Sequence, residues 1–278
     1  MQVVSTAALP IDLAGQVAAA VPGAVVRAPA AGHTPIAEVE LAGADALICL
    51  LRDRVDGAVL ARAPRLRVIA NCAVGYDNLD LAATRAAGVW VTHTPDVLTE
   101  ATAELAFALA LAAARRLGEG ERLVRSGAWA GWALDQLLGV GLAGKTFGVV
   151  GYGRIGQAVG RRAAAFGMDV VYAGPRPVDG APGRWVELDA LFAAADVVSL
   201  HCPLTPATHH LVDARRLAQM KPTAILVNTA RGGLVDDAAL AAALDRGALF
   251  AAGLDVYPAE PDIPRSEERR VGKECLRL

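Results

Sequence analysis

Cysteine, aromatic side chains and net charge are all scarce in this sequence. Four cysteines occur among 278 residues, no two of them form a CxxC pair, and none stands at a metal-ligand spacing from a histidine. We therefore expect reduced thiols in a cytoplasmic protein, and no metal site. The formal net charge of −2 provides no basic field, which excludes nucleic acid and anionic membrane surfaces as expected partners.

Targeting and membrane-spanning segments are also lacking. Residues 1–15 have neither a basic start nor a long apolar run, so they do not resemble a signal peptide. The most apolar stretch, Ala101–Leu117, contains Glu104, Arg115 and Arg116. Its uninterrupted apolar run is too short to cross a bilayer, and we predict a buried helix there.

Short apolar runs, by contrast, are abundant. Apolar residues make up 54% of the chain, and their runs alternate with alanine-rich segments that favour helix. Runs bounded by Gly, Pro or Asp and separated by helices predict βα units with buried parallel sheets, an α/β fold. The predicted strands are Ala46–Leu51, Arg67–Cys72, Val89–His93, Phe147–Gly151, Asp169–Gly174, Asp196–Cys202, Ala224–Ala230 and Phe250–Val256.

These strands fall into two groups. The first group ends before Pro95, and the second starts at Phe147. Between them lie a long predicted helix, Glu100–Arg125, and a Trp-containing loop, Gly127–Gly144. We therefore predict two α/β domains, residues 1–95 and 96–264, joined by a helix near residue 96. The strand pattern stops after residue 264.

A glycine-rich turn follows the strand Phe147–Gly151. Gly151, Gly153 and Gly156 complete a GxGxxG pattern, and a helix is predicted from Gln157 to Phe166. The pattern alone is weak evidence, but a position between strand and helix is the context that dinucleotide binding requires. The backbone of this turn, which includes Arg154 and Ile155, would hold the diphosphate at the helix N-terminus. A glycine-rich loop without function is the alternative.

The next predicted strand lacks the acidic residue that usually binds the ribose 2′-hydroxyl. Gly174, Pro175 and Arg176 stand there instead. Glycine leaves room for a 2′-phosphate, and a guanidinium can pair with it through two hydrogen bonds. The segment favours NADP over NAD. The alternative is that Arg176 is a solvated loop residue and that NAD is used.

Several longer motifs resemble the D-isomer-specific 2-hydroxyacid dehydrogenases. They are NCAVGYDNLDL (71–81), TPDVLTEATAELA (94–106), HCPLTPATHHLV (201–212), MKPTAILVNTARGGLVDDAAL (220–240) and AAGLDVYPAEP (251–261). The resemblance implies a flavodoxin-like substrate domain over 1–95 and a Rossmann cofactor domain over 96–264. Within the family, YAGPRPV (172–178) and the paired Trp129 and Trp132 are similar to the glyoxylate and hydroxypyruvate reductase branch.

The resemblance also implies roles for single residues. Arg231 would bind the substrate carboxylate and polarise the reacting carbonyl. Glu260 would hydrogen-bond a catalytic histidine, and Asp255 would hold the nicotinamide carboxamide. Taken alone, Arg231 could form a surface ion pair, and the two acids could be ordinary loop residues.

Further residues complete the implied site. Val74 and Gly75 would offer backbone N–H groups to the carboxylate, and Trp132 would approach the substrate from a second subunit of a homodimer. An equally simple interpretation of Trp132 is a core or interface residue. The remaining cofactor contacts would be Thr102, Cys202, Pro203, Thr208, Thr229 and Ala230.

The proton donor of the family is missing. It is a histidine in a Thr-Pro-His-Ile-Gly segment beyond the Glu-Pro motif, and no histidine follows Glu260 here. His201 stands at the family's His-Cys-Pro position, where a cofactor-loop role is implied. Loss of the general acid typically slows a reaction by about 10²–10⁴-fold, so we expect impaired turnover.

Residues 265–278, RSEERRVGKECLRL, stand where the family has that histidine segment and a helix that returns to the first domain. We expect this tail to be foreign or artefactual, a genuine frameshift being the alternative. The cofactor domain would then be incomplete at its C-terminal end, with an exposed sheet edge, and the substrate domain would lack its returning helix.

Together these features predict an enzyme that transfers a hydride from NADPH to glyoxylate or hydroxypyruvate. A NAD-dependent enzyme similar to phosphoglycerate dehydrogenase is one alternative. A non-catalytic dinucleotide sensor or corepressor-like protein is another, although the retained Arg231 and Glu260 argue against it. A broken fragment is the third.

Overall fold

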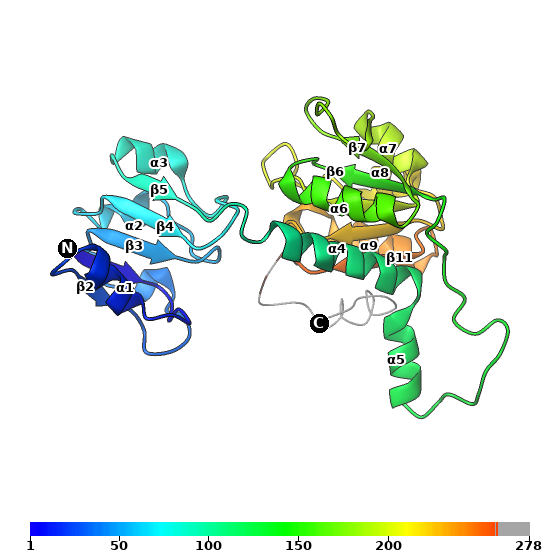
Figure 1. The fold of residues 1–278 in the computed structure, drawn as a ribbon, viewed down its shortest axis with the longest axis horizontal. Helices are drawn as coiled ribbons and strands as arrows, with labels where there is room; N and C mark the ends of the chain where they lie inside the picture. Colours follow the sequence, from blue (N-terminus) through cyan, green and yellow to red (C-terminus); the bar gives the residue numbers. More distant parts are fainter. Residues whose placement is uncertain (259, 261–278) are drawn as a thin grey trace. The chain divides into compact units, whose positions relative to one another are not determined.

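A computed structural model describes residues 1–258 and residue 260. The chain divides into a first compact unit, Met1–Leu98, and a second unit that begins at Thr99 (Figure 1). The sequence-based border between residues 95 and 96 lies three residues earlier. The tail 265–278, and with it the expected loss of a strand and a helix, lies outside the described residues.

The first unit is built on a five-stranded parallel sheet with the order β2-β1-β3-β4-β5. This is the flavodoxin-like order, in which the chain reverses direction across the sheet between β1 and β3. Its strands are β1 (Gln2–Ser5), β2 (Val25–Arg27), β3 (Ala46–Cys49), β4 (Val68–Asn71) and β5 (Trp90–Thr92). Its helices are α1 (Leu13–Ala20), η1 (Ile36–Glu38), α2 (Gly57–Ala61) and α3 (Leu81–Ala86).

The second unit contains a six-stranded parallel sheet with the order β11-β10-β9-β6-β7-β8. This is the doubly wound Rossmann order, and the reversal between β6 and β9 is where such folds bind ligands. Its strands are β6 (Thr146–Val150), β7 (Asp169–Ala173), β8 (Arg184–Trp185), β9 (Val197–Leu200), β10 (Ile225–Asn228) and β11 (Ala251–Leu254). The predicted α/β fold with parallel sheets is confirmed.

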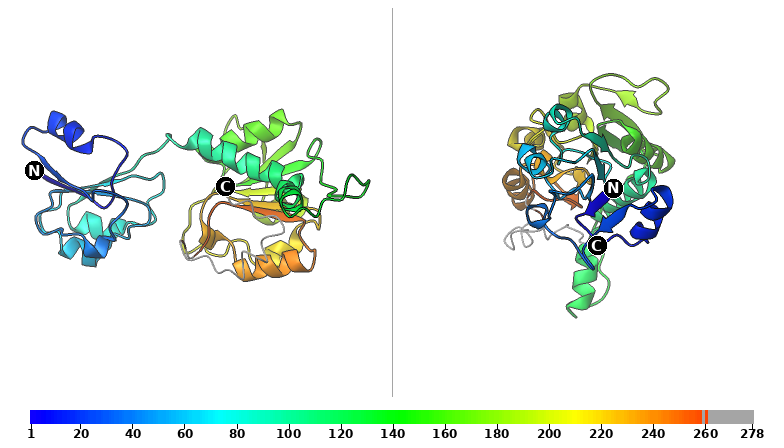
Figure 2. Two further views of the ribbon diagram at one scale, coloured as in Figure 1. Left: turned by 90° about the horizontal axis from the view of Figure 1, so that it is seen from below. Right: turned by 90° about the vertical axis from the view of Figure 1, so that its left-hand side faces the viewer.

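Helices cover both faces of this sheet, as the left panel of Figure 2 shows. One core joins α4 (Thr99–Ala114) and α6 (Arg154–Ala165) to side chains such as Phe147 and Ile225. The other joins α7 (Leu188–Ala194), α8 (Ala214–Gln219) and α9 (Asp237–Asp245) to side chains such as Val198 and Leu226. Because successive strand residues point to opposite faces, strands buried on both sides are apolar throughout, which is why the sequence showed unbroken runs.

The most apolar segment of the chain is the buried helix that we predicted. Ala103, Ala106 and Ala110 of α4 are fully buried, and Leu109 lies against Gly253 of β11. Small side chains let this helix approach the sheet closely. No helix among the described residues is long and apolar enough to cross a membrane.

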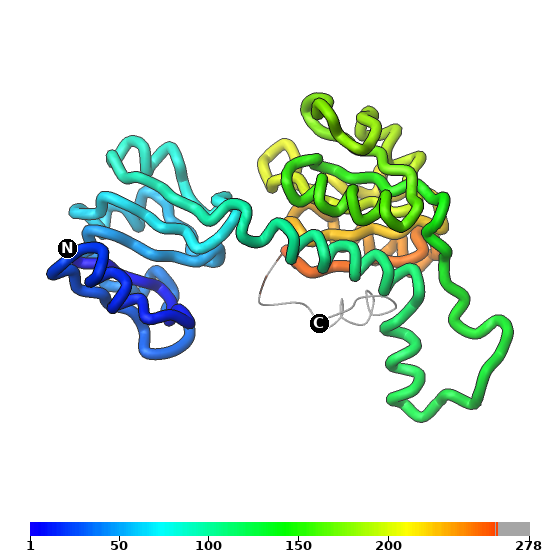
Figure 3. The backbone as a smooth tube through the Cα atoms, viewed as in Figure 1, coloured from blue at the N-terminus to red at the C-terminus, as the bar shows by residue number. Residues whose placement is uncertain are grey.

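The single long helix predicted over Glu100–Arg125 is wrong. It is interrupted at Arg116, which adopts a left-handed backbone conformation with φ 54°, and a second helix, α5 (Leu117–Arg125), follows. The Arg116 side chain pairs with Glu119 in the first turn of α5, which stabilises the break. Figure 3 shows α5 and the loop after it projecting from the rest of the second unit.

Candidate cofactor and substrate site

The glycine turn after β6 has the geometry that a dinucleotide needs. Gly151 has φ +92°, and a Cβ there would lie 2.6 Å from the Cys202 backbone nitrogen, so no larger residue fits. A Cβ on Gly156 would collide with the Gly151 carbonyl oxygen and lie 3.0 Å from Val149 Cγ1, which shows how closely α6 packs on β6. A Cβ on Gly153 would have nothing within 4 Å. The open space beside Gly153 is therefore available to a ligand.

The N-terminus of α6, like those of α5 and α7, has no side-chain cap, in contrast to five other described helices. Five described helices begin after an aspartate whose carboxylate accepts backbone N–H groups of the first turn: Asp12, Asp56, Asp80, Asp213 and Asp236. The N-cap of α6 is Gly153, which has no side chain to do this. The N–H groups and the positive end of the helix dipole thus face the open space, where they can bind a phosphate.

A cavity of about 440 Å³ adjoins the glycine turn. Of the residues proposed from the sequence to bind cofactor, it brings together Gly151, Gly174, Pro175, Cys202, Pro203 and Thr208. The Thr208 hydroxyl donates to the Pro203 carbonyl oxygen at 2.7 Å and accepts from the Thr205 N–H, so it holds the cavity wall in shape. A cavity of this size, next to a helix N-terminus, can take the nucleoside part of a dinucleotide.

Sequence reasoning missed the far wall of this cavity. It is lined by Trp185, the last residue of the two-residue strand β8, and by the next three residues, Val186, Glu187 and Leu188. A strand this short has no periodicity to detect. The only available signal was the isolated Trp185 among small and polar residues.

Arg176 follows Gly174 and Pro175, two residues that line the cavity. Its side chain is exposed and forms no ion pair with any other described residue, and the only acid nearby in the sequence, Asp179, is exposed as well. Gly174, where an acidic residue would oppose a 2′-phosphate, has nothing within 4 Å of an added Cβ. The end of β7 therefore has open space and no carboxylate, and a cation follows two residues later.

A second group of predicted residues lies at the carboxyl ends of β10 and β11. Asn228 is buried, and its side chain accepts from the Ala230 N–H at 3.0 Å and donates to the Arg231 carbonyl oxygen at 2.9 Å. These bonds fix the turn that carries Arg231. The Thr229 hydroxyl is buried there without a hydrogen-bond partner among the described residues, as expected of a group that awaits a ligand.

Gly232 brings the two strand ends together. A Cβ on Gly232 would collide with the backbone of Tyr257 and Pro258, so the loop after β10 lies directly against the loop after β11. In the second loop, Glu260 Oε1 accepts from the Tyr257 N–H at 2.6 Å. Desolvation, and then the charge of the Glu260 carboxylate, raise the pKa of Asp255, which places the two predicted acids near each other.

His201 does not have the protonation state of a general acid. Its Nε2 lies 2.8 Å from the Ser199 hydroxyl, and burial lowers its pKa to about 4. The imidazole is therefore neutral at physiological pH and lacks the acidic proton of an imidazolium. His201 follows β9 and lies beside the glycine turn, and its implied cofactor-loop role remains a prediction.

The first unit contributes the turn Val74–Gly75 after β4. The Val74 carbonyl oxygen lies 2.9 Å from His93 Nδ1, and the Gly75 carbonyl oxygen accepts from Asn71 Nδ2 at 2.9 Å. Within the described chain, neither residue's N–H donates to another group. Both carbonyl groups are held and both donors are left open, which is the arrangement that binds a carboxylate.

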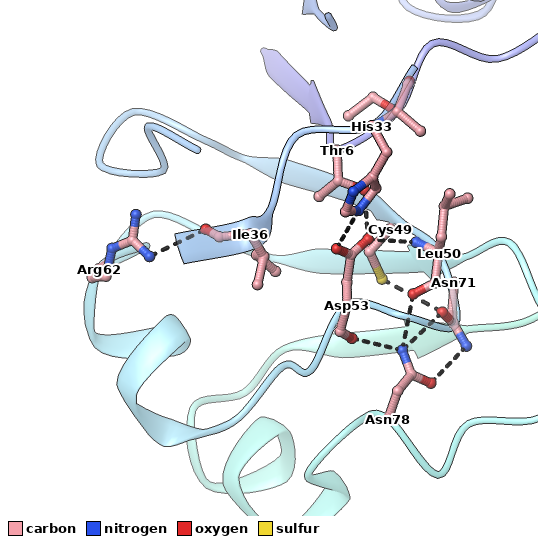
Figure 4. A network of polar contacts seen from close by, with 11 residues as sticks. Thr6, His33, Ile36, Cys49, Leu50, Asp53, Arg62, Asn71 and Asn78 are labelled. Atoms are coloured by element: carbon pink, nitrogen blue, oxygen red, sulfur yellow. Dashed lines mark hydrogen bonds and ion pairs between the residues drawn. The ribbon is translucent and has the colours of Figure 1, made fainter. Parts of the chain in front are cut away.

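Asn71, which holds the Gly75 carbonyl oxygen, belongs to a wider polar network (Figure 4). Asn71 and Asn78 hydrogen-bond each other through their amides, and Asn78 also donates to the backbone oxygens of Leu50 and Asp53. The buried Asp53 carboxylate accepts from Thr6 Oγ1 at 2.6 Å and from the Leu50 N–H at 2.8 Å, and it lies 2.7 Å from His33 Nε2. The ends of β1, β3 and β4 are thereby tied together. None of these side chains was proposed from the sequence, because Thr6, His33 and Asp53 lie far along the chain from Asn71 and Asn78.

Two predicted residues lie apart from these groups. Thr102 is half-buried in the first turns of α4 and does not line the cavity. Trp132 is 79% exposed in the loop after α5, so its proposed contribution to a site remains a prediction.

Comparison with known proteins bears directly on this arrangement. Residues 107–272 match the family model of the NAD-binding domain of D-isomer-specific 2-hydroxyacid dehydrogenases. The chain is 48% identical over 225 residues to a glyoxylate reductase of Thermococcus litoralis, covering 78% of this chain and 68% of that protein.

The chain belongs to the D-isomer-specific 2-hydroxyacid dehydrogenase family. Among solved structures it is similar to the TT0316 protein from Thermus thermophilus, with a TM-score of 0.91 and 47% identity, over 99% of this chain and 88% of that one. It is also similar to an NADPH-dependent glyoxylate/hydroxypyruvate reductase from Sinorhizobium meliloti, solved with NADP and malonate, with a TM-score of 0.82 and 31% identity over 95% and 82% of the chains. The protein is an oxidoreductase of this family, acting on CH–OH groups with a nicotinamide cofactor.

Proposed function

We propose that the protein is a reductase that uses NADPH to convert glyoxylate or hydroxypyruvate into the corresponding 2-hydroxy acid. The observation that carries this proposal is the cavity beside the N-terminus of α6, where Gly174 replaces the acid at the end of β7 and the exposed Arg176 follows two residues later. Relatives named glyoxylate reductase and an NADPH-dependent glyoxylate/hydroxypyruvate reductase support the substrate class and the cofactor.

The residues of the second unit fit a bound dinucleotide. The glycine turn would hold the diphosphate, the cavity the adenosine, and Thr229, Ala230 and Asp255 the nicotinamide end. When bound, the reduced nicotinamide supplies a hydride for C2 of the 2-oxo acid. The orphaned Thr229 hydroxyl and the open space at Gly153 agree with such an occupant.

Arg231 would bind the substrate carboxylate and polarise the C2 carbonyl. The hydrogen bonds of Asn228 fix the turn that carries it. In the first unit, the N–H groups of Val74 and Gly75 would bind a carboxylate. Glu260 would orient a histidine that protonates the forming alkoxide.

A homodimer is part of the proposal. Leu117 and Val124 of α5, and Trp129, Trp132, Leu134 and Leu138 in the loop after it, are all more than half exposed. A projecting apolar surface of this kind is typical of an interface. Trp132 would then approach the substrate of the partner subunit.

The test combines binding and turnover. NADPH and NADH affinities are measured by titration, and reduction of glyoxylate, hydroxypyruvate, pyruvate and 3-phosphohydroxypyruvate is followed by loss of reduced nicotinamide. We expect NADPH to bind more tightly than NADH. We also expect reduction of glyoxylate and hydroxypyruvate, and Arg231→Ala should abolish it. Equal or better use of NADH would overturn the role of Arg176. Activity that survives Arg231→Ala would overturn the substrate site, and binding without any turnover would favour a dinucleotide sensor.

A further inference from the structure

We propose that Tyr172 is a positioning residue for cofactor selectivity. It lies in β7, just before the cavity rim, and fixes the loop that carries Arg176. The inference rests on the proposed function, in which Arg176 recognises a 2′-phosphate. It adds a residue that touches no cofactor itself and acts only through that loop.

The Tyr172 hydroxyl is used entirely by one residue of the loop. Its oxygen accepts from the Val178 N–H at 2.9 Å, and the same hydroxyl lies 3.4 Å from the Val178 carbonyl oxygen, to which it donates. Tyr172 is only 2% exposed, and its ring stacks on Tyr152 with centroids 4.0 Å apart. The Tyr172 ring is thus fixed in the core of the sheet. Its hydroxyl hydrogen-bonds both the N–H and the carbonyl group of Val178, which lies two positions beyond Arg176.

The other end of the loop has an anchor of its own. Trp185 Nε1 donates to the Gly174 carbonyl oxygen at 3.2 Å, from the strand next to β7. Between the anchors stand only Pro175, Arg176 and Pro177. Proline fixes its own φ and keeps the residue before it out of the helical region, so Arg176 has little backbone freedom left.

Such a loop matters because of what Arg176 lacks. Its side chain is exposed and has no ion-pair partner among the described residues, so only the backbone of the loop limits where the guanidinium can lie. Holding the backbone in one conformation before binding reduces the entropy lost when the guanidinium meets a phosphate. NADH has no 2′-phosphate, so its affinity does not benefit from a fixed conformation of this loop. The two cofactors should therefore respond differently to loss of the anchor.

The experiment measures dissociation constants of NADPH and NADH, by nicotinamide fluorescence, for the full chain and its variants. Tyr172→Phe removes the hydroxyl and keeps the buried ring. We expect it to weaken NADPH about three- to tenfold, the range of one net hydrogen bond, and to leave NADH within about twofold. In an Arg176→Ala background, Tyr172→Phe should change neither constant further.

Tyr152→Phe is the matched control. Tyr152 belongs to the same stack, but its hydroxyl is buried toward Gly160 and has no partner among the described residues. Its removal should leave the NADPH-to-NADH ratio unchanged. Thermal unfolding of the apo protein accompanies each variant, and if Tyr172→Phe is too unstable for titration, Trp185→Phe removes the other anchor instead.

The outcomes separate the two proposals. Wild-type protein without preference for NADPH overturns both. A preference that Arg176→Ala abolishes but Tyr172→Phe leaves intact overturns only the positioning role. Equal weakening of both cofactors by Tyr172→Phe also overturns it, because a purely structural residue would act in that way. Selective loss of NADPH affinity, confined to the background that retains Arg176, supports it.

Discussion

The two turns that are proposed to bind anions are built in opposite ways. The turn Gly151–Gly156 in the second unit is shaped by residues without side chains, whose backbone is forced by close packing of β6, α6 and the chain at Cys202. The turn Val74–Gly75 in the first unit is shaped by side chains, Asn71 and His93, which hold its carbonyl oxygens from outside. In the first kind, Gly151 and Gly156 leave no room for a larger side chain. The second kind can lose one support at a time.

The largest effect should come from Gly151→Ala. The residue has φ +92°, and the new methyl group would lie 2.6–2.8 Å from backbone atoms of His201 and Cys202, which cannot move independently. We expect a loss of about 3 kcal/mol or more in the free energy of unfolding. Denaturant unfolding monitored by circular dichroism measures this, and a variant as stable as wild type would contradict the close-packed account of the turn.

Gly153→Ala separates binding from folding in the same turn. Its backbone has φ −77°, and an added Cβ meets nothing within 4 Å, so the melting temperature should stay unchanged. The methyl group would occupy the space of the diphosphate and weaken NADPH by about tenfold or more. Calorimetric titration checks the affinity. Undiminished binding would show that the diphosphate does not lie against Gly153.

The sequence predicts the turn of the second unit better than the turn of the first unit, because the two turns are held in these different ways. The glycines of the second unit leave a fixed spacing in the chain, and all eight predicted strands, which follow the apolar runs, are present. Strands β1, β2 and β8 were missed because they lie in no long apolar run. The supports of Val74–Gly75 come from residues as far apart as Asn71 and His93, and no local pattern joins them.

Asn71→Ala tests the side-chain-built turn. Asn71 is 1% exposed, and its amide holds the Gly75 carbonyl oxygen and pairs with Asn78. Its removal leaves buried polar groups without partners, which should cost about 1–3 kcal/mol of unfolding free energy. Binding of oxamate, an unreactive 2-oxo acid analogue, to the NADPH-loaded protein should weaken, while NADPH affinity stays unchanged. Weakening of both ligands alike would mean that the damage is general.

The free energy of unfolding should depend on pH through His201, which lies next to the turn Gly151–Gly156. Burial lowers the folded-state pKa of His201 to about 4, below its ordinary value of 6.5. The unfolded chain therefore binds the extra proton first, so this contribution to stability is complete above about pH 6.5 and is lost as the pH falls toward 4. The loss is on the order of 2 kcal/mol. Denaturant unfolding at pH 7 and pH 4.5 should show a smaller decline for His201→Gln than for wild type, and identical declines would contradict a buried neutral imidazole.

The smallest effect should follow from loss of the outer support, in His93→Ala. His93 is exposed, and beyond its hydrogen bond to the Val74 carbonyl oxygen it contacts the Tyr76 ring edge-on, with centroids 5.5 Å apart. Because little is buried, the melting temperature should hardly change. The Val74 carbonyl group becomes free to rotate, which should weaken oxamate binding by about two- to fivefold, less than a full hydrogen bond to the ligand would cost. His93→Gln keeps a donor of similar reach and should restore part of the affinity, whereas Tyr76→Phe, which keeps the ring, should have no effect. If His93→Ala binds oxamate as wild type does, Asn71 alone holds the turn, and the first unit needs only one side chain where the second needs three glycines.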